Sequence, residues 1–329
     1  MILTGIVLAV LSGLCNGLFS APMRLEKTWK WENIWLAFIV VACLLMPAVI
    51  VFSSTPDWKT ILASSPRGSI TSAVLFGFAW GFGAICFGLS VERLGVSIAN
   101  SVIIGLSSAL GSIVPLLTSG DFRWNAQIVL LLCGVAVFLV GVALCGRAGR
   151  IRDQASGRAL PSGYLFALVS GIMSGVFNIG YSLALPIADT GVHLGRSRFQ
   201  STNCIWLLML GAGAIPNVGY CLYLMQRNRT GWLSLSYAPM SWLRGISMGV
   251  LWGGSIFLYG AATPLLGNIG PSIGWPLSLA VGLLVANLMG MLLGEWGKAS
   301  HAAIRSMNAG IVSLMLAIII CAVSTRVAP

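Results

Sequence analysis

The sequence predicts an all-α integral membrane protein whose ten transmembrane helices form two inverted five-helix repeats. Three observations lead to this prediction: the composition, the number of long apolar segments, and a similarity between the two halves of the chain. Of the 329 residues, 57% are hydrophobic and only 8% are charged, and the mean hydropathy is +0.92. Soluble domains carry about 25% charged residues, so the composition excludes an ordinary soluble protein.

Ten apolar segments are long enough to cross a bilayer, which requires roughly 20 apolar residues in a helix. They run over residues 2–21, 33–53, 69–90, 96–118, 126–146, 163–185, 201–225, 243–263, 270–293 and 303–325. The 40 glycines fit this arrangement, because small residues let helices pack closely in lipid. Gly270, Pro271, Gly274 and Pro276 make the start of the ninth segment the expected place for irregular backbone.

The basic residues are unequally divided between the two sides of the predicted membrane. The odd-numbered loops and their flanks carry 13 Lys and Arg residues, and the even-numbered side carries 6. Cytoplasmic loops are enriched in Lys and Arg, so we expect both termini outside. The net charge of +11 thus reflects membrane topology, and its spread over short loops does not indicate nucleic-acid binding.

The two halves of the chain resemble each other at two offsets. At an offset of 158 residues, six of fifteen positions of the first and sixth segments are identical, including Ser12 with Ser170 and Gly17 with Gly175. At an offset of 172, the third segment matches the eighth through pairs such as Trp80 with Trp252. We therefore expect one five-helix repeat over residues 1–158 and a second over 159–329.

A repeat of five spans makes the second copy enter the membrane the other way up. Inverted repeats are typical of secondary transporters, which bind substrate near the midplane between the repeats and alternate access by moving one unit against the other. A duplicated channel or scaffold is the alternative interpretation.

Three stretches of sequence resemble a known family. These are GLFSAPMRLEKTWKWENIW at residues 17–35, the segment from Phe76 to Leu117, and GEWGKAS at 294–300. They are similar to the L-rhamnose-proton symporter family of the drug/metabolite transporter superfamily, over the first 150 residues and again near the end. The resemblance implies the ten-helix, five-plus-five fold and proton-coupled uptake of a deoxy sugar across the cell inner membrane.

The sequence also departs from that family in one segment. Residues 268–276 read NIGPSIGWP, where better-known members carry polar and acidic residues around a Tyr-Asp pair. This departure leaves open the substrate and the coupling ion. Two alternatives stay open as well: an exporter of another small metabolite, and a membrane receptor or scaffold that does not transport.

A sugar site needs neutral donors and acceptors for the hydroxyls and an aromatic face for the apolar side of the ring. Asn16 and Ser20 share a helix face, and their repeat counterparts are Ser174 and Asn178, with Tyr181 on the same face. The other predicted substrate-binding residues are Trp80, Asn100, Trp252, Trp275 and Asn287. Helix packing is the alternative role for these side chains.

Proton coupling requires a group whose protonation changes with its exposure. The candidates are Glu92, at the end of the third span, and Glu295, at the end of the ninth. Coupling by Na⁺, or none, stays open. We expect no cofactor and no metal, because the eight cysteines lie in apolar segments without a CxxC pair and no nucleotide-binding or catalytic motif is present. The predicted partners are a small molecule and the lipid bilayer, and the chain is not expected to be an enzyme.

Overall fold

The computed structural model describes residues 2–94, 96–118, 124–153, 161–292, 294, 296–297 and 299–325. Within these ranges the fold is all-helical, without a strand, and ten helical spans are long and apolar enough to cross a membrane. The spans are α1 with α2 (Ile2–Leu18, Ala21–Arg24), α3 with η1 and α4 (Trp31–Ile39, Val40–Leu45, Met46–Ser54), α6 (Arg67–Leu94), α7 (Val96–Thr118), α8 (Ala126–Asp153), α9 (Pro161–His193), α10 (Arg198–Asn228), α12 with η3 (Pro239–Ala262, Thr263–Leu266), α13 (Gly270–Leu292) and α14 (His301–Ser324).

The number of spans predicted from the sequence is confirmed, and most observed helices are longer than predicted. The sixth span, expected over 163–185, runs as α9 to His193, because Pro186 is accommodated inside the helix. Two short helices, α5 (Trp58–Ser64) and α11 (Gly231–Leu235), lie in the connections and were not predicted. Hydropathy detects the buried length of a helix and not its solvated ends, which accounts for the difference.

The irregular backbone is not where the sequence predicted it. α13 is continuous from Gly270 to Leu292. Pro271 lies in its first turn, where a missing N–H costs nothing, and Pro276 is accommodated inside the helix. The chain instead turns just before α13, through the 3₁₀ segment η3 and Gly267 at φ +90°. A second irregularity is the π-helical segment η1, which precedes Pro47 in the second span. A proline cannot donate to the helix ladder, so the turn before it readjusts.

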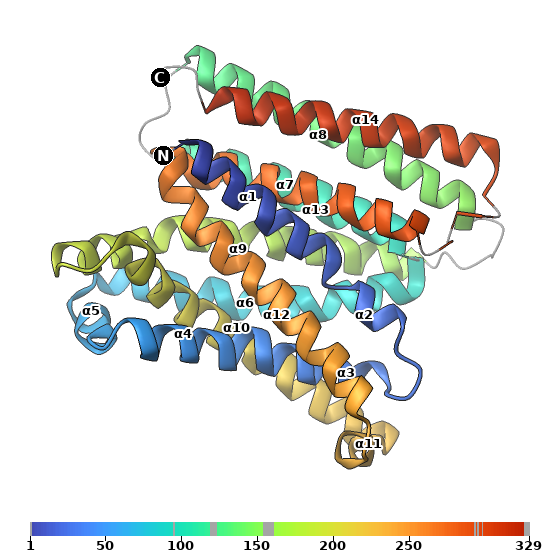
Figure 1. Cartoon of the computed structure of the whole chain (residues 1–329), viewed down its shortest axis with the longest axis horizontal. Helices are drawn as coiled ribbons and strands as arrows, with labels where there is room; N and C mark the ends of the chain where they lie inside the picture. The colour runs from blue at the N-terminus through green and yellow to red at the C-terminus, as the bar shows by residue number, and fades with distance from the viewer. Residues whose placement is uncertain are drawn as a thin grey trace.

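Helix packing follows a regular scheme (Figure 1). α1 packs against α12 and α13, α9 packs against α6 and α7, and α7 packs against α13 near the middle of the bundle. α8 and α14 pack along each other at one edge of the bundle. The aromatic core lies among α6, α9, α10, α12 and α13.

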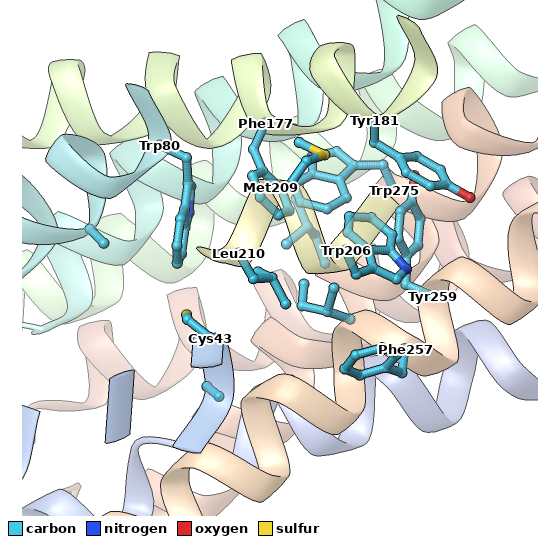
Figure 2. Packing of buried hydrophobic residues seen from close by; sticks show 14 of the residues in the cluster. Cys43, Trp80, Phe177, Tyr181, Trp206, Met209, Leu210, Phe257, Tyr259 and Trp275 are labelled. Carbon is cyan, nitrogen blue, oxygen red and sulfur yellow. The ribbon is translucent and has the colours of Figure 1, made fainter. Parts of the chain in front are cut away.

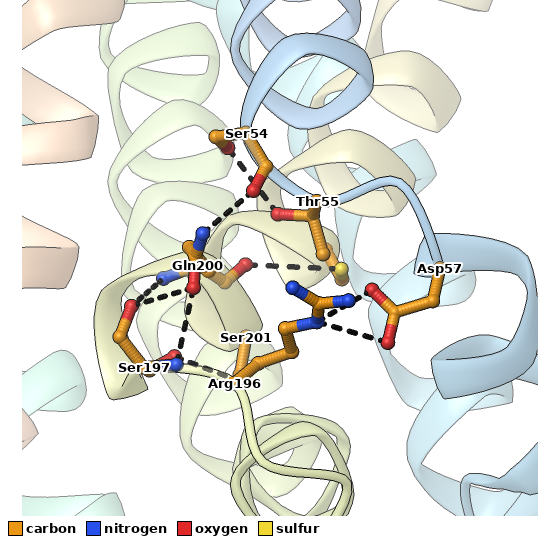
Figure 3. Close-up of polar contacts among 8 residues, drawn as sticks. Ser54, Thr55, Asp57, Arg196, Ser197, Gln200 and Ser201 are labelled. Carbon is orange, nitrogen blue, oxygen red and sulfur yellow. Dashed lines mark hydrogen bonds and ion pairs between the residues drawn. The ribbon is translucent and has the colours of Figure 1, made fainter.

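The two ends of the bundle differ in charge. We call the end at which α1 begins and α14 ends the terminal face, and the opposite end, with the α2–α3 and α10–α12 connections, the basic face. At the terminal face, Arg196 forms an ion pair with Asp57 at 2.8 Å, and Gln200 donates to the Ser54 carbonyl at 2.6 Å (Figure 3). These contacts join the α4–α5 connection to the start of α10.

Polar contacts also join the same pair of spans at the basic face. Asn33 of α3 donates to the Thr230 carbonyl at 2.9 Å and to Ser234 at 2.8 Å. Nearby, Glu26 accepts from Ser241 at 2.9 Å and pairs with Arg244 at 3.0 Å. The second span is therefore tied to both ends of the seventh, at the start of α10 and just beyond its last residue.

Candidate functional site

A cavity of about 160 Å³ lies in the middle of the bundle. It is lined by residues of α1, α3, α6, α7, α9, α12 and α13. One water needs only about 10–15 Å³ measured in this way, so the cavity has room for a small solute. Among the described residues, no charged side chain lines it.

Glycines on α1 and α9 position the polar groups of the cavity. A Cβ at Gly13 would lie 2.5 Å from the Val281 Cβ of α13, and one at Gly175 would lie 2.8 Å from the Leu110 Cβ of α7. Only glycine permits this approach. The close packing places Ser12 on α1 and Ser170 on α9 at the cavity wall.

The hydroxyl groups of the cavity are partly paired with one another. Ser12 donates to the Ser255 carbonyl at 2.8 Å, and its hydroxyl lies 2.8 Å from that of Ser278. On the other side, Ser107 donates to Ser174 at 2.9 Å, and the Trp275 indole N–H donates to Ser107 at 3.2 Å. These side chains form two neutral polar groups, one that joins α1, α12 and α13 and one that joins α7, α9 and α13.

Aromatic rings make up much of the remaining wall. Trp80 and Trp252 stack on each other, with ring centroids 5.0 Å apart and an interplanar angle of 14°. Phe177 lies against Trp80 at 5.1 Å, and Phe38 meets Trp252 edge-on at 5.9 Å. Such rings offer an apolar surface to one face of a ligand, and the serines and asparagines offer hydrogen bonds to the other.

The structure brings together seven of the ten predicted substrate-binding residues. The cavity is lined by Asn16, Ser20, Trp80, Asn100, Ser174, Trp252 and Trp275. It is also lined by polar residues that the sequence analysis did not select, which are Ser12, Ser170, Ser255, Ser278 and Tyr259. The identity of Ser12 and Ser170 at the 158-residue offset was a signal for two of these.

Three predicted residues lie outside the cavity. Asn178 is fully buried and donates to the Gly111 carbonyl at 2.6 Å and to the Pro271 carbonyl at 3.2 Å. Tyr181 is also fully buried, with its hydroxyl 2.6 Å from that of Thr263. Asn287 faces α8, beside Cys145. A shared helix face thus did not ensure a shared environment, because the helix meets different neighbours along its length.

The two proton-coupling candidates lie outside what the structure describes. The backbone of Glu92 belongs to the last turn of α6, but its side chain and the whole of Glu295 fall among the residues not described. All eight cysteines are free thiols, and the described residues contain no group of three or more metal-ligating side chains.

The cavity opens toward the basic face. The residues on that side, such as Ser20, Phe87, Asn100 and Ala286, line the cavity and are partly exposed. On the side of the terminal face, the cavity ends against side chains that are at most 1% exposed, such as Tyr259 and Trp206. Figure 2 shows Tyr181, Trp206, Tyr259 and Trp275 gathered at one end of the aromatic cluster, with Trp80 at the other.

A comparison with known protein families matches nearly the whole chain. The model of the L-rhamnose-proton symport protein family matches residues 1–326. The chain belongs to that family. The match covers the segment 150–245, where the resemblance read from the sequence was weakest, and it includes every helix that lines the cavity.

Individual relatives within the L-rhamnose-proton symport protein family have low sequence identity to the chain but align with it over most of its length. A protein named L-rhamnose-proton symporter from Klebsiella pneumoniae (strain 342) is 26% identical over 315 residues, which is 91% of each chain. The protein of the same name from Cronobacter sakazakii (strain ATCC BAA-894) is 27% identical over 327 residues, or 95% of each chain. With its ten apolar spans, the chain is a multi-pass membrane protein of the symporter class.

Proposed function

We propose that this chain is a secondary transporter that takes up L-rhamnose, or a closely similar neutral sugar, together with protons. The observation that carries the proposal is a central cavity lined by neutral serine and asparagine side chains and by stacked tryptophans. Membership of the L-rhamnose-proton symport protein family supports the same substrate class. The relatives bear the name L-rhamnose-proton symporter.

The lining suits a deoxy sugar for a physical reason. Each sugar hydroxyl that leaves water needs a replacement partner, because an unpaired buried polar group is costly. Asn16, Asn100 and Ser174 supply such partners without a charge. A methyl group and the C–H face of the sugar ring give up no hydrogen bonds to water when they are buried. They need only apolar contact, which Trp252 and Trp275 supply.

We propose further that residues 1–158 and 159–329 are inverted repeats of the drug/metabolite transporter fold. Helix contacts support this, because they occur in matched pairs five spans apart. The contact of α6 with α9 corresponds to that of α12 with α1, and the contact of α7 with α9 corresponds to that of α13 with α1. In the contacts of α8 with α14 and of α7 with α13, the two helices are each other's counterparts, so each contact maps onto itself. This is the expected pattern for a two-fold axis in the membrane plane.

The orientation follows from the positive-inside rule. The odd-numbered loops and their flanks, which lie at the basic face where the structure describes them, contain 13 of the 19 Lys and Arg residues of the sequence, so we assign this face to the cytoplasm and both termini to the outside. The cavity opens toward this face, which makes the described state inward-open. Bacterial relatives support a location in the cell inner membrane.

Proton coupling is assigned to a carboxylate near the membrane, with Glu92 and Glu295 as the candidates. The support is the family's function together with the lining of the cavity, in which no described side chain is a carboxylate. In the Glu295→Gln variant, loss of proton-driven accumulation with retained sugar exchange would assign the proton to that residue, and the same test applies to Glu92→Gln.

Uptake into proteoliposomes tests the proposed function. Labelled L-rhamnose should accumulate under an inward proton gradient, and an uncoupler should abolish the accumulation. Asn16→Ala should lower the affinity by about tenfold, since a lost hydrogen bond in a desolvated site costs about 1–3 kcal/mol. Asn287→Ala is the matched control, because Asn287 lies outside the cavity. No uptake by a folded protein, or equal effects of both variants, would contradict the proposal.

A further inference from the structure

The path from the cavity to the terminal face is closed by a cluster of aromatic side chains and the hydrogen bonds that join it to neighbouring helices. Tyr259 donates its hydroxyl hydrogen bond to the Asn178 side-chain oxygen. Asn178 in turn donates to the carbonyls of Gly111 on α7 and Pro271 on α13, at 2.6 and 3.2 Å. The Asn178 amide thereby joins α9, α12, α7 and the start of α13, which are four of the helices around the site.

Two further rings complete this closure (Figure 2). Tyr181 and Trp206 stack with ring centroids 4.4 Å apart at an interplanar angle of 10°. The Tyr259 ring lies 5.5 Å from that of Tyr181. None of the three side chains is more than 1% exposed. The terminal side of the cavity is therefore sealed by packed rings that a hydrogen-bond network holds in place.

The matching positions in the other half of the chain lie at the open mouth. The offset of 158 pairs Asn178 with Ser20, and the offset of 172 pairs Tyr259 with Phe87. Trp206 pairs with Trp35 at an offset of 171. The same offset relates Gly213 of α10, which Gly81 approaches, to Ala42 of η1, which Gly253 approaches. Ser20, Phe87 and Trp35 all line the cavity.

The two sets have similar shapes but different chemistry. The Trp35 and Phe87 ring centroids lie 6.4 Å apart and the Trp206 and Tyr259 centroids 6.3 Å apart, although the first pair is stacked at 18° and the second is tilted at 52°. Phe87, however, has no hydroxyl group with which to bond Ser20. The hydrogen bond that locks the closed side has no counterpart on the open side.

Polar atoms in the closed half give independent support. In the part of the chain that the structure describes, three neighbouring polar side chains on α10 are buried without a hydrogen-bond partner: the Thr202 hydroxyl, the Asn203 amide and the Trp206 indole N–H. Such groups cost free energy unless another state satisfies them. Opening of this side to water would supply the missing partners.

We propose that Asn178 and Tyr259 form the gate that closes the transport path at the terminal face, and that Phe87 and Ser20 close against Trp35 at the basic face when this gate opens. The proposal rests on the proposed alternating-access function. At the basic face Trp35 donates to Asn217 at 3.0 Å, but Phe87 cannot form a bond like that of Tyr259 with Asn178. Because this bond joins the two gate residues only at the terminal face, the protein at rest favours the state that is open at the basic face. Tyr259→Phe gives both gates the same ring and should shift this equilibrium toward opening at the terminal face.

Chemical labelling tests the gate. Thr202→Cys is introduced into a chain whose eight native cysteines are replaced, and a membrane-impermeant thiol reagent is added from the terminal face of sealed vesicles. Thr202 is fully buried in the closed state, so labelling should be slow. Adding Tyr259→Phe should speed it about fivefold, as expected for the loss of one hydrogen bond. A reporter at Ser20→Cys, labelled from the basic face, should react more slowly in the same variant.

Tyr223→Phe is the matched control, because it removes a hydroxyl group from an exposed tyrosine on α10. It should leave both labelling rates unchanged. The proposed gate would be wrong if Thr202→Cys were labelled at the same rate in chains with and without Tyr259→Phe, provided that both proteins elute as a single folded species. Labelling needs neither sugar nor a proton gradient, so its outcome is separate from that of the L-rhamnose uptake test.

Discussion

Trp80 and Trp252 stack face to face at 5.0 Å, although 172 residues separate them along the chain. Each lies one residue before a glycine that is closely packed against a neighbouring helix, Gly81 against Gly213 and Gly253 against Ala42. The indole of Trp80 on α6 thus meets the indole of Trp252 on α12 at the cavity lining. Because each ring covers one face of the other, they form a single wall of the site.

The first prediction concerns the coupling between these two rings. Trp80→Ala and Trp252→Ala should each destabilise the protein, and the double variant should cost about 1 kcal/mol less than the sum, because aromatic pairs interact by that amount beyond their burial. Thermal unfolding of the four proteins in detergent measures this coupling. Trp80→Ala combined with Trp232→Ala is the control and should be additive, since Trp232 is exposed. Additivity in both pairs would contradict the stacking.

The second prediction concerns close helix contact. A Cβ at Gly77 of α6 would lie 2.6 Å from the Met209 Cα of α10. Gly77→Ala should therefore destabilise the protein by about 1–3 kcal/mol, because backbone cannot move aside as a side-chain tip can. Gly254→Ala is the matched control, with nothing within 4 Å of the added Cβ, and should be neutral or stabilising by up to about 1 kcal/mol. Equal melting temperatures for the two variants would exclude this contact.

The third prediction concerns pH. Burial raises the pKa of Glu26, but hydrogen bonds from the backbone of Trp29 and Thr28 and from Arg244 and Ser241 outweigh it and lower the pKa to about 2, from 4.5. A carboxylate with a lowered folded pKa stabilises the fold above pH 4.5 and loses that contribution as the pH falls toward 2. Glu26→Gln should thus lower the melting temperature at pH 7 and have a shrinking effect below pH 4.5.

An exposed ion pair serves as the control for Glu26. Asp189 pairs with Arg198, but its side chain is 51% exposed. Asp189→Asn should change the stability by less than about 1 kcal/mol, because exposed ion pairs are weak. If Glu26→Gln behaved like Asp189→Asn at pH 7, the buried network at the basic face would not contribute as described.

The fourth prediction concerns Trp275, which lies in the segment NIGPSIGWP at residues 268–276. Its indole N–H donates to Ser107, and its ring lines the cavity. Trp275→Phe should weaken sugar binding by about tenfold, because the Ser107 carbonyl and hydroxyl are left without their donor. Titration calorimetry with L-rhamnose measures the affinity. Trp296→Phe, a buried tryptophan outside the cavity, should bind as the parent does.

Much of the site could be anticipated from residue type and spacing. Asn16, Ser20 and Ser174 were selected as neutral polar residues on helices that the predicted repeat relates, and they line the cavity. Tyr259 was not selected, because a tyrosine in an apolar segment gives no sign of its partner. Its role depends on the Asn178 oxygen, which is 81 residues away in the chain.

By itself, the sequence determined that the chain is a helical membrane protein with ten spans, because apolar length is a local property that each segment carries alone. Only the tertiary structure decided what each polar side chain meets. The predicted repeat pairs Ser20 with Asn178, yet Ser20 lines the open cavity and Asn178 is sealed in a hydrogen-bond network. The reason is that hydrogen-bond partners come from other helices, and the two ends of the bundle are packed differently in this state.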